Sequence, residues 1–160
     1  MRLIAITGML HQPKARFTQA LIELLSAETD RLALLDNSDV PLAINGVTSQ
    51  RLAGGCVCCS LATALISQLW RLDADFALLP VSALADPGAL ASILNSMRSE
   101  RVQTSTVSLI DTLTQMRNPY LTRKLESYSD FQVREPFDFS ETVHALVRVR
   151  HMRSKAALPG

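Results

Sequence analysis

The feature that most constrains this chain is an alternation between short apolar runs and longer stretches whose apolar residues recur at helical spacing. The short runs predict buried strands at residues 1–7, 31–35, 75–81 and 104–110. The longer stretches predict helices at residues 15–25, 61–72, 88–97 and 140–155. Strands that alternate with helices predict a parallel α/β sheet with helices on both faces, because each parallel connection must cross over one face.

The length of the chain indicates one domain. At 160 residues the chain can bury a sizeable core but is short for two domains. We therefore expect residues 1–160 to form a single three-layer α/β sandwich, with a helical C-terminal end from about residue 140.

Composition and charge exclude several classes of partner. Apolar residues make up 48% of the chain and charged residues 19%, with a net charge of +1, so a general electrostatic affinity for nucleic acid is not supported. No apolar stretch approaches the roughly 20 residues that span a bilayer, and the first apolar run is too short for a signal peptide. We expect a cytoplasmic protein that binds neither nucleic acid nor membrane.

Four polar or glycine-containing segments follow the predicted strands or precede the predicted helices. In open parallel sheets, ligands collect at the carboxyl ends of the strands. We expect one functional edge formed by residues 8–14, 36–50, 54–60 and 82–87.

The first of these segments has the length and register of the phosphate loop G-x-x-x-x-G-K-[ST]. Gly8 and Lys14 match the pattern, whereas Pro13 and Ala15 replace its second glycine and its magnesium-binding hydroxyl. Proline offers no N–H to a phosphate, and alanine has no ligand atom for magnesium. Lys14 could still reach a phosphate as a point charge, or it could be a solvated lysine in a disabled loop.

All three cysteines of the chain are clustered as C-x-C-C, at Cys56, Cys58 and Cys59. Thiolates are soft ligands for zinc or copper and are also nucleophiles, so the cluster predicts a metal site or thiol chemistry. Three thiolates would supply three of the four positions around zinc and leave one for Asp, His or water. Asp36 and Asp39 are candidates for that position because they lie in a loop after a strand, although a role in turn formation is the simpler interpretation. Three buried small residues are the alternative for the cysteines themselves.

Five segments stand in a recognisable order: ITGMLHQPKAR at 6–16, LLDNSD at 34–39, GGCVCCSL at 54–61, VSALADP at 81–87 and VREPFD at 133–138. In this order they resemble the nucleotide-binding domain of the CobW-type metallochaperone GTPases, relatives of the UreG and HypB proteins. The resemblance spans about residues 3–145, and its most specific parts are GCVCCSL and LADP. It implies a P-loop NTPase-like fold and a metallochaperone context.

The chain also departs from the family pattern at several catalytic positions, and we expect it to lack the family's second, C-terminal domain. Besides the altered phosphate loop, the departures are Asn37, Pro80, Ala83, Glu135 and Pro136. The resemblance then leaves Gly8, Lys14 and Asp138 as the residues of a degenerate nucleotide site. Each departure affects a different group that GTP hydrolysis requires. We therefore expect a pseudo-GTPase, and the resemblance does not establish GTP or magnesium as its cofactors.

Three functions follow from these observations. The first is a catalytically inactive CobW-like domain that binds zinc or a similar ion through the C-x-C-C cluster. It would act as a homodimer or with a functional CobW-type relative, and it would serve a client protein that requires the metal. The second is an active GTP hydrolase that uses Lys14, Asp36 and Asp86 in an atypical site. The third is a thiol-based redox or scaffold protein.

Overall fold

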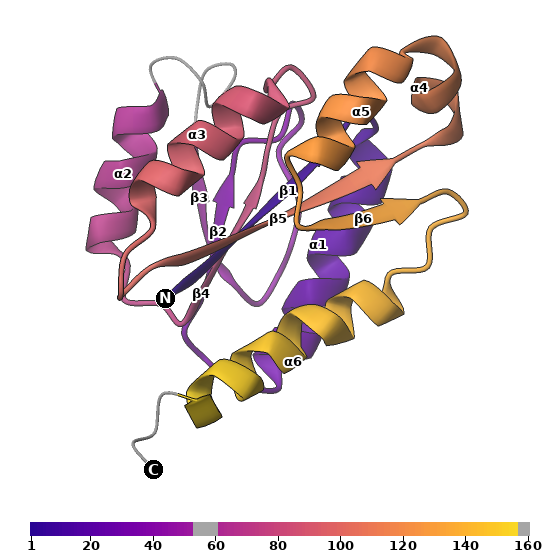
Figure 1. Cartoon of the computed structure of the whole chain (residues 1–160). Helices are drawn as coiled ribbons and strands as arrows, with labels where there is room; N and C mark the ends of the chain where they lie inside the picture. The colour runs from indigo at the N-terminus through magenta and orange to yellow at the C-terminus, as the bar shows by residue number, and fades with distance from the viewer. Residues whose placement is uncertain (53–60, 157–160) are drawn as a thin grey trace.

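A wholly parallel sheet of six strands forms the middle layer of the molecule (Figure 1). The computed structural model describes residues 1–52 and 61–156. The strands are β1 (Arg2–Gly8), β2 (Leu32–Asp36), β3 (Thr48–Arg51), β4 (Phe76–Pro80), β5 (Gln103–Ile110) and β6 (Phe131–Arg134), and their order in the sheet is β3-β2-β4-β1-β5-β6.

Helices cover both faces of this sheet. They are α1 (His11–Ser26), α2 (Leu61–Arg71), α3 (Pro87–Met97), α4 (Thr112–Arg117), α5 (Pro119–Ser127) and α6 (Ser140–Ala156). One core joins α1 and α6 to the sheet, and a second joins α2 and α3 to its other face, where α5 lies beside α3 (Figure 1). The predicted three-layer α/β architecture is confirmed. None of the helices in the described part of the chain is long and apolar enough to cross a membrane.

The central strand β1 is buried along its whole length. Ile4 and Ile6 belong to the core under α1 and α6, whereas Leu3 and Ala5 belong to the core under α2 and α3. Alternating side chains therefore enter opposite cores, as expected for a parallel strand covered on both faces.

The four predicted strands and four predicted helices are present, but four further elements were not predicted. The edge strands β3 and β6 have only four residues each, and most of their side chains are not buried. Their sequences therefore lack the apolar runs on which strand prediction depends. The sequence did contain a signal for the short helices α4 and α5, namely the N-cap residues Asp111 and Asn118. In the structure both accept hydrogen bonds from backbone N–H groups of the helix that follows.

A proline interrupts the sheet at the end of β4. Pairing of β4 with β1 continues to Ile6 and Pro80, whereas its regular pairing with β2 stops at Leu34 and Leu78. Proline has no N–H to donate to the ladder. The carbonyl of Pro80 still accepts a hydrogen bond from the Asn37 N–H at 3.0 Å, which holds the start of the loop after β2 against the end of β4.

The close approach of β1 to β5 requires glycine at position 8, where φ is +151° and an added Cβ would lie 2.7 Å from the Leu109 carbonyl oxygen. We predict that Gly8→Ala lowers the free energy of unfolding by roughly 2 kcal/mol or more, because backbone strain and overpacking act together. Gly46→Ala is the control. Gly46 also has positive φ, +83°, but nothing within 4 Å of the added atom, so its cost should be roughly 1 kcal/mol. Urea denaturation measures both, and equal losses would contradict the steric argument.

Candidate functional site

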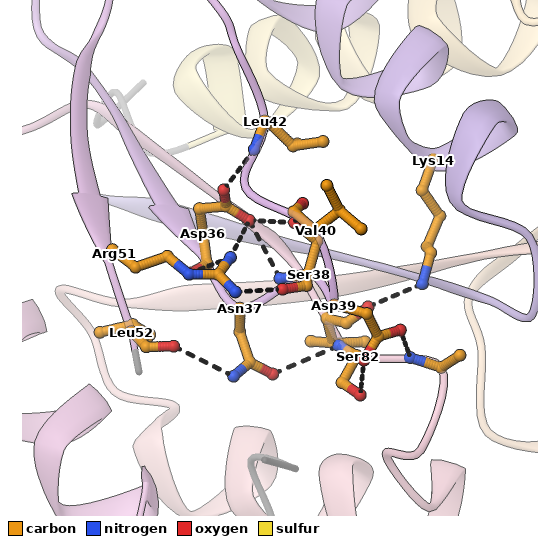
Figure 2. A network of polar contacts seen from close by, with 12 residues as sticks. Lys14, Asp36, Asn37, Ser38, Asp39, Val40, Leu42, Arg51, Leu52 and Ser82 are labelled. Atoms are coloured by element: carbon orange, nitrogen blue, oxygen red, sulfur yellow. Dashed lines mark hydrogen bonds and ion pairs between the residues drawn. The ribbon is translucent and has the colours of Figure 1, made fainter. Parts of the chain in front are cut away.

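The candidate site lies at the carboxyl ends of β1 and β4. The chain leaves β1 through α1 toward β2, whereas it leaves β4 through α3 toward β5, on the other side of β1. Such a reversal of direction is where open α/β sheets bind their ligands. Helix α1, which follows β1, meets the loops after β2 and β4 at this point. The side chains of Lys14 and Asp39 form hydrogen bonds with the loop after β4 (Figure 2).

The connection between β1 and α1 is shorter than the sequence predicted. Only Met9 and Leu10 separate the two elements, because α1 begins at His11 and not at Ala15. The prediction of a loop over residues 8–14 is therefore wrong. The helix can begin before Lys14 because Pro13 fits the first turn of a helix. There the fixed φ of proline is suitable and its missing N–H costs nothing. Residues 11–14, which were predicted to belong to the loop, are the first residues of the helix instead.

Lys14 is consequently a buried residue. Its side chain is only 1% exposed, and its Nζ donates a hydrogen bond to the Val81 carbonyl oxygen at 2.9 Å, just beyond the end of β4 (Figure 2). Burial lowers the pKa of the Lys14 amine, and the carboxylate of Asp39 opposes part of this shift. The interpretation of Lys14 as a solvated lysine is wrong, because its amine joins α1 to β4 through the interior.

Asp39 faces Lys14 from the loop after β2. Its carboxylate accepts hydrogen bonds from the Ser82 hydroxyl at 2.5 Å and from the Ala83 N–H at 2.9 Å (Figure 2). The hydrogen bond from Ser82 is the largest cause of the lowered pKa of Asp39, and the Ala83 N–H and the charges of Lys14 and His11 act in the same direction. Asp39 therefore stays ionised and connects the loop after β2 to the loop after β4.

Asp36, a predicted carboxylate ligand, is 2% exposed, and its carboxylate binds groups of the loop after β2 and of β3. One oxygen accepts hydrogen bonds from the N–H and hydroxyl of Ser38 and pairs with Arg51 at 3.2 Å. The other accepts from the Leu42 N–H at 2.8 Å (Figure 2). Turn formation, the simpler interpretation of this residue, matches these contacts.

Gly8 and Asp138, which were also predicted for the site, do not join this cluster. Gly8 packs against Leu109 of β5. Asp138 follows β6, which β5 separates from β1, and its carboxylate accepts hydrogen bonds from the N–H and hydroxyl of Ser140 at the start of α6. These hydrogen bonds lower the pKa of Asp138.

The three cysteines, Cys56, Cys58 and Cys59, lie outside the described residues. Among the side chains that the structure describes, in residues 1–52 and 62–148, no group of three from His, Cys, Asp or Glu could hold a metal ion. Asp86, proposed for the alternative hydrolase, caps α3 through the Ala89 N–H and pairs with Lys124. Lys14, Asp36 and Asp86 are thus each engaged with different partners.

Sequence analysis did not identify Ser82 as a member of the site. The available signal was a hydroxyl residue directly after a buried strand, at the edge shared with Lys14. Only the pairing of Asn37 with the end of β4 brings Asp39 within reach of that hydroxyl.

Comparisons with known proteins support the fold. No protein-family model and no curated protein sequence matches this chain. Among solved structures, the Zn(II)-bound YjiA GTPase from E. coli is similar with a TM-score of 0.52 and 14% identity over 84% of this chain. The hydrogenase maturation factor HypB from Archaeoglobus fulgidus is similar with a TM-score of 0.50 and 12% identity over 93% of this chain. The chain spans 48% of the YjiA structure and 90% of the HypB structure.

The buried amine of Lys14 predicts a specific pH dependence of stability. Because its pKa is lowered by folding, the unfolded chain binds the proton more tightly between the folded value and the ordinary value of about 10.4. The contribution of Lys14 to stability should therefore rise with pH in this window. In urea denaturation from about pH 7 to about pH 10, the stability of the unaltered protein should increase relative to that of Lys14→Met.

Lys124→Met is the matched control, since the hydrogen bond to Asp86 raises the pKa of Lys124. Its stabilising contribution is complete below about pH 10.4 and is lost only as pH rises through the raised pKa. The stability difference for Lys124→Met should therefore not grow over the same interval. A difference for Lys14→Met that is independent of pH would contradict the assignment of a buried, pKa-shifted amine.

Proposed function

We propose that this chain is a GTPase-like domain that does not hydrolyse GTP and that binds zinc or a similar ion through Cys56, Cys58 and Cys59. The proposal that the chain does not hydrolyse GTP rests on the buried position of Lys14. Its amine is bound to the Val81 carbonyl inside the protein, and the residues before it are helical. A phosphate would find neither a free lysine nor an open loop at this position.

The loss of the phosphate loop agrees with the chemistry of the neighbouring residues. Pro13 has no N–H to offer, and Ala15 has no oxygen for magnesium. Asp138, the remaining residue of the predicted guanine site, accepts its hydrogen bonds from Ser140. No single substitution would restore the N–H at position 13, the magnesium ligand at position 15 and the guanine site together.

The chemistry of the donor set supports metal binding. A C-x-C-C cluster supplies soft thiolate ligands, for which zinc and copper compete well. One of the similar structures, the YjiA GTPase, is described as Zn(II)-bound. Asp36 is a weaker candidate for a fourth ligand, because both of its oxygens already accept hydrogen bonds or pair with Arg51.

A second copy of the chain is the partner that we propose for completing the metal site. The cysteines supply three thiolates, and the described residues contribute no further cluster of ligands. Large apolar side chains are also exposed on the loops and helices that follow the carboxyl ends of the strands, where an interface would exclude water. They are Met9, Leu10, Val40, Leu84, Leu113 and Met116. A functional CobW-type relative would meet the same surface, and a client protein would receive the metal.

Elemental analysis of tag-free protein tests this proposal, together with equilibrium binding of GTP. We expect about one zinc per chain or per dimer, loss of zinc when all three cysteines are replaced by serine, and no saturable GTP binding. Size-exclusion chromatography with light scattering reports whether zinc and dimer are lost together. Clear GTP binding without metal would favour the hydrolase, and the absence of both would favour the redox or scaffold protein.

Asp36→Asn separates the structural from the metal-binding role of that carboxylate. We expect it to lower the free energy of unfolding by roughly 1–3 kcal/mol, because Arg51 and the N–H donors lose a charged acceptor, while the zinc content stays unchanged. Thermal unfolding and elemental analysis measure the two effects. Loss of zinc at unchanged stability would show that Asp36 is a ligand.

A further inference from the structure

Two cavities adjoin at the amino ends of the strands, at the opposite edge of the sheet from the candidate site. The larger has a volume of about 580 Å³, is lined mainly by polar residues and lies where β1, β5 and β6 begin. The smaller has a volume of about 260 Å³ and lies between the C-terminal parts of α2 and α3. Arg98, Ser99 and Val102 line both cavities, so one ligand can occupy the two together.

The smaller cavity offers an apolar surface to a ligand. Its apolar walls are Ile66, Leu69 and Trp70 of α2, Met97 of α3 and Val102 before β5. Trp70 is 73% exposed although it borders this cavity. An exposed indole beside a concave apolar surface favours a ligand with an apolar body, because covering the ring removes a large apolar area from water.

Arg98 lies at the junction of the two cavities with its side chain held in place. Its Nε donates a hydrogen bond to the hydroxyl of buried Thr104 at 2.7 Å, and its Nη2 lies 3.5 Å from the Thr104 carbonyl oxygen. Within the described part of the chain, the Arg98 guanidinium forms no ion pair and its Nη1 has no hydrogen-bond partner. A guanidinium with a fixed plane and an unused N–H group is suited to bind a carboxylate.

The charge around the larger cavity fits a ligand with one negative charge. Among the described residues that line it, Arg2 and Arg98 are cationic and Asp130 is anionic. Arg2 is buried and donates a hydrogen bond to the Leu146 carbonyl oxygen at 2.8 Å, so it contributes positive charge from inside the protein. A singly charged carboxylate balances this set of charges better than a doubly charged phosphate does.

We propose that the two cavities form one binding site for a small amphipathic carboxylic acid. The carboxylate of the ligand pairs with the Arg98 guanidinium, and its apolar chain lies in the smaller cavity against Leu69 and Trp70. A medium-chain fatty acid such as octanoate represents this class. The site uses neither the cysteines nor the residues around Lys14, so the inference does not depend on the proposed function.

The test is titration of octanoate into the unaltered protein, followed by tryptophan fluorescence. Trp70 is the only tryptophan of the chain and lines the smaller cavity, so its emission reports occupation of the site. We expect a saturable shift of the emission to shorter wavelength. From hexanoate to heptanoate to octanoate, binding should tighten by roughly threefold to fourfold for each CH₂ that is buried. Octan-1-ol, which has the same chain without the charge, should bind roughly tenfold more weakly.

Arg98→Met removes the guanidinium and keeps an unbranched side chain. We expect it to weaken octanoate binding by roughly tenfold and to leave octan-1-ol binding unchanged, which also shows that the cavity is intact. Arg98→Lys should have an intermediate effect, because an ammonium group keeps the charge but lacks the planar fork. Arg101→Met is the matched control, since Arg101 is exposed nearby but lines neither cavity. Its octanoate affinity should equal that of the unaltered protein.

Equal affinities of the unaltered protein for octanoate and octan-1-ol would overturn the inference, because the cation would then play no part; this comparison requires no variant. A titration that does not saturate would also overturn it. So would an Arg101→Met variant that weakens octanoate binding as much as Arg98→Met, since general charge would then explain the effect. None of these outcomes changes the expected zinc content or GTP binding, on which the proposed function is tested separately.

Discussion

The structure depends on the burial of β1 between two strands and two layers of helices. All seven residues of β1 are buried, and its backbone is paired with β4 on one side and with β5 on the other. A strand without an accessible face needs apolar or hydrogen-bonded side chains in both directions, and a neighbouring strand along each edge. Gly8 extends this constraint to the end of the strand, since the carbonyl of Leu109 occupies the place of a side chain. The loops of the candidate site start from this rigid centre.

At the carboxyl edge, the polar groups that a ligand would meet are satisfied by one another. Lys14 donates to Val81, Asp39 accepts from Ser82 and Ala83, and Asp36 pairs with Arg51. Buried polar groups carry a large free-energy cost when they lack partners, so each of these groups needs a partner within the chain or in a bound ligand. The folded chain provides them. This physical requirement connects α1 to the loops after β2 and β4, although these segments are far apart in sequence.

The proposed metal site and the polar contacts around Asp39 use different segments of the chain. Metal binding would depend on thiols between β3 and α2 in the sequence, whereas the contacts of Lys14 and Asp39 join α1 and the loops after β2 and β4. A partner protein bound at the carboxyl edge of the sheet would cover its exposed apolar side chains, such as those of Leu84 and Met116. The chain would then act by holding a metal and a second protein, and its sheet would serve as the support.

The sequence alone determined the parallel α/β architecture, because strands such as β1 and β4 are continuous apolar runs and α1 has apolar residues at helical spacing. It also predicted that Pro13 and Ala15 disable a phosphate loop, since these side chains lack the required groups whatever the fold. Tertiary structure alone decided that Lys14 turns inward to Val81 and that Asp39 reaches Ser82. These outcomes depend on contacts between residues more than forty positions apart, which neither local periodicity nor motif spacing specifies.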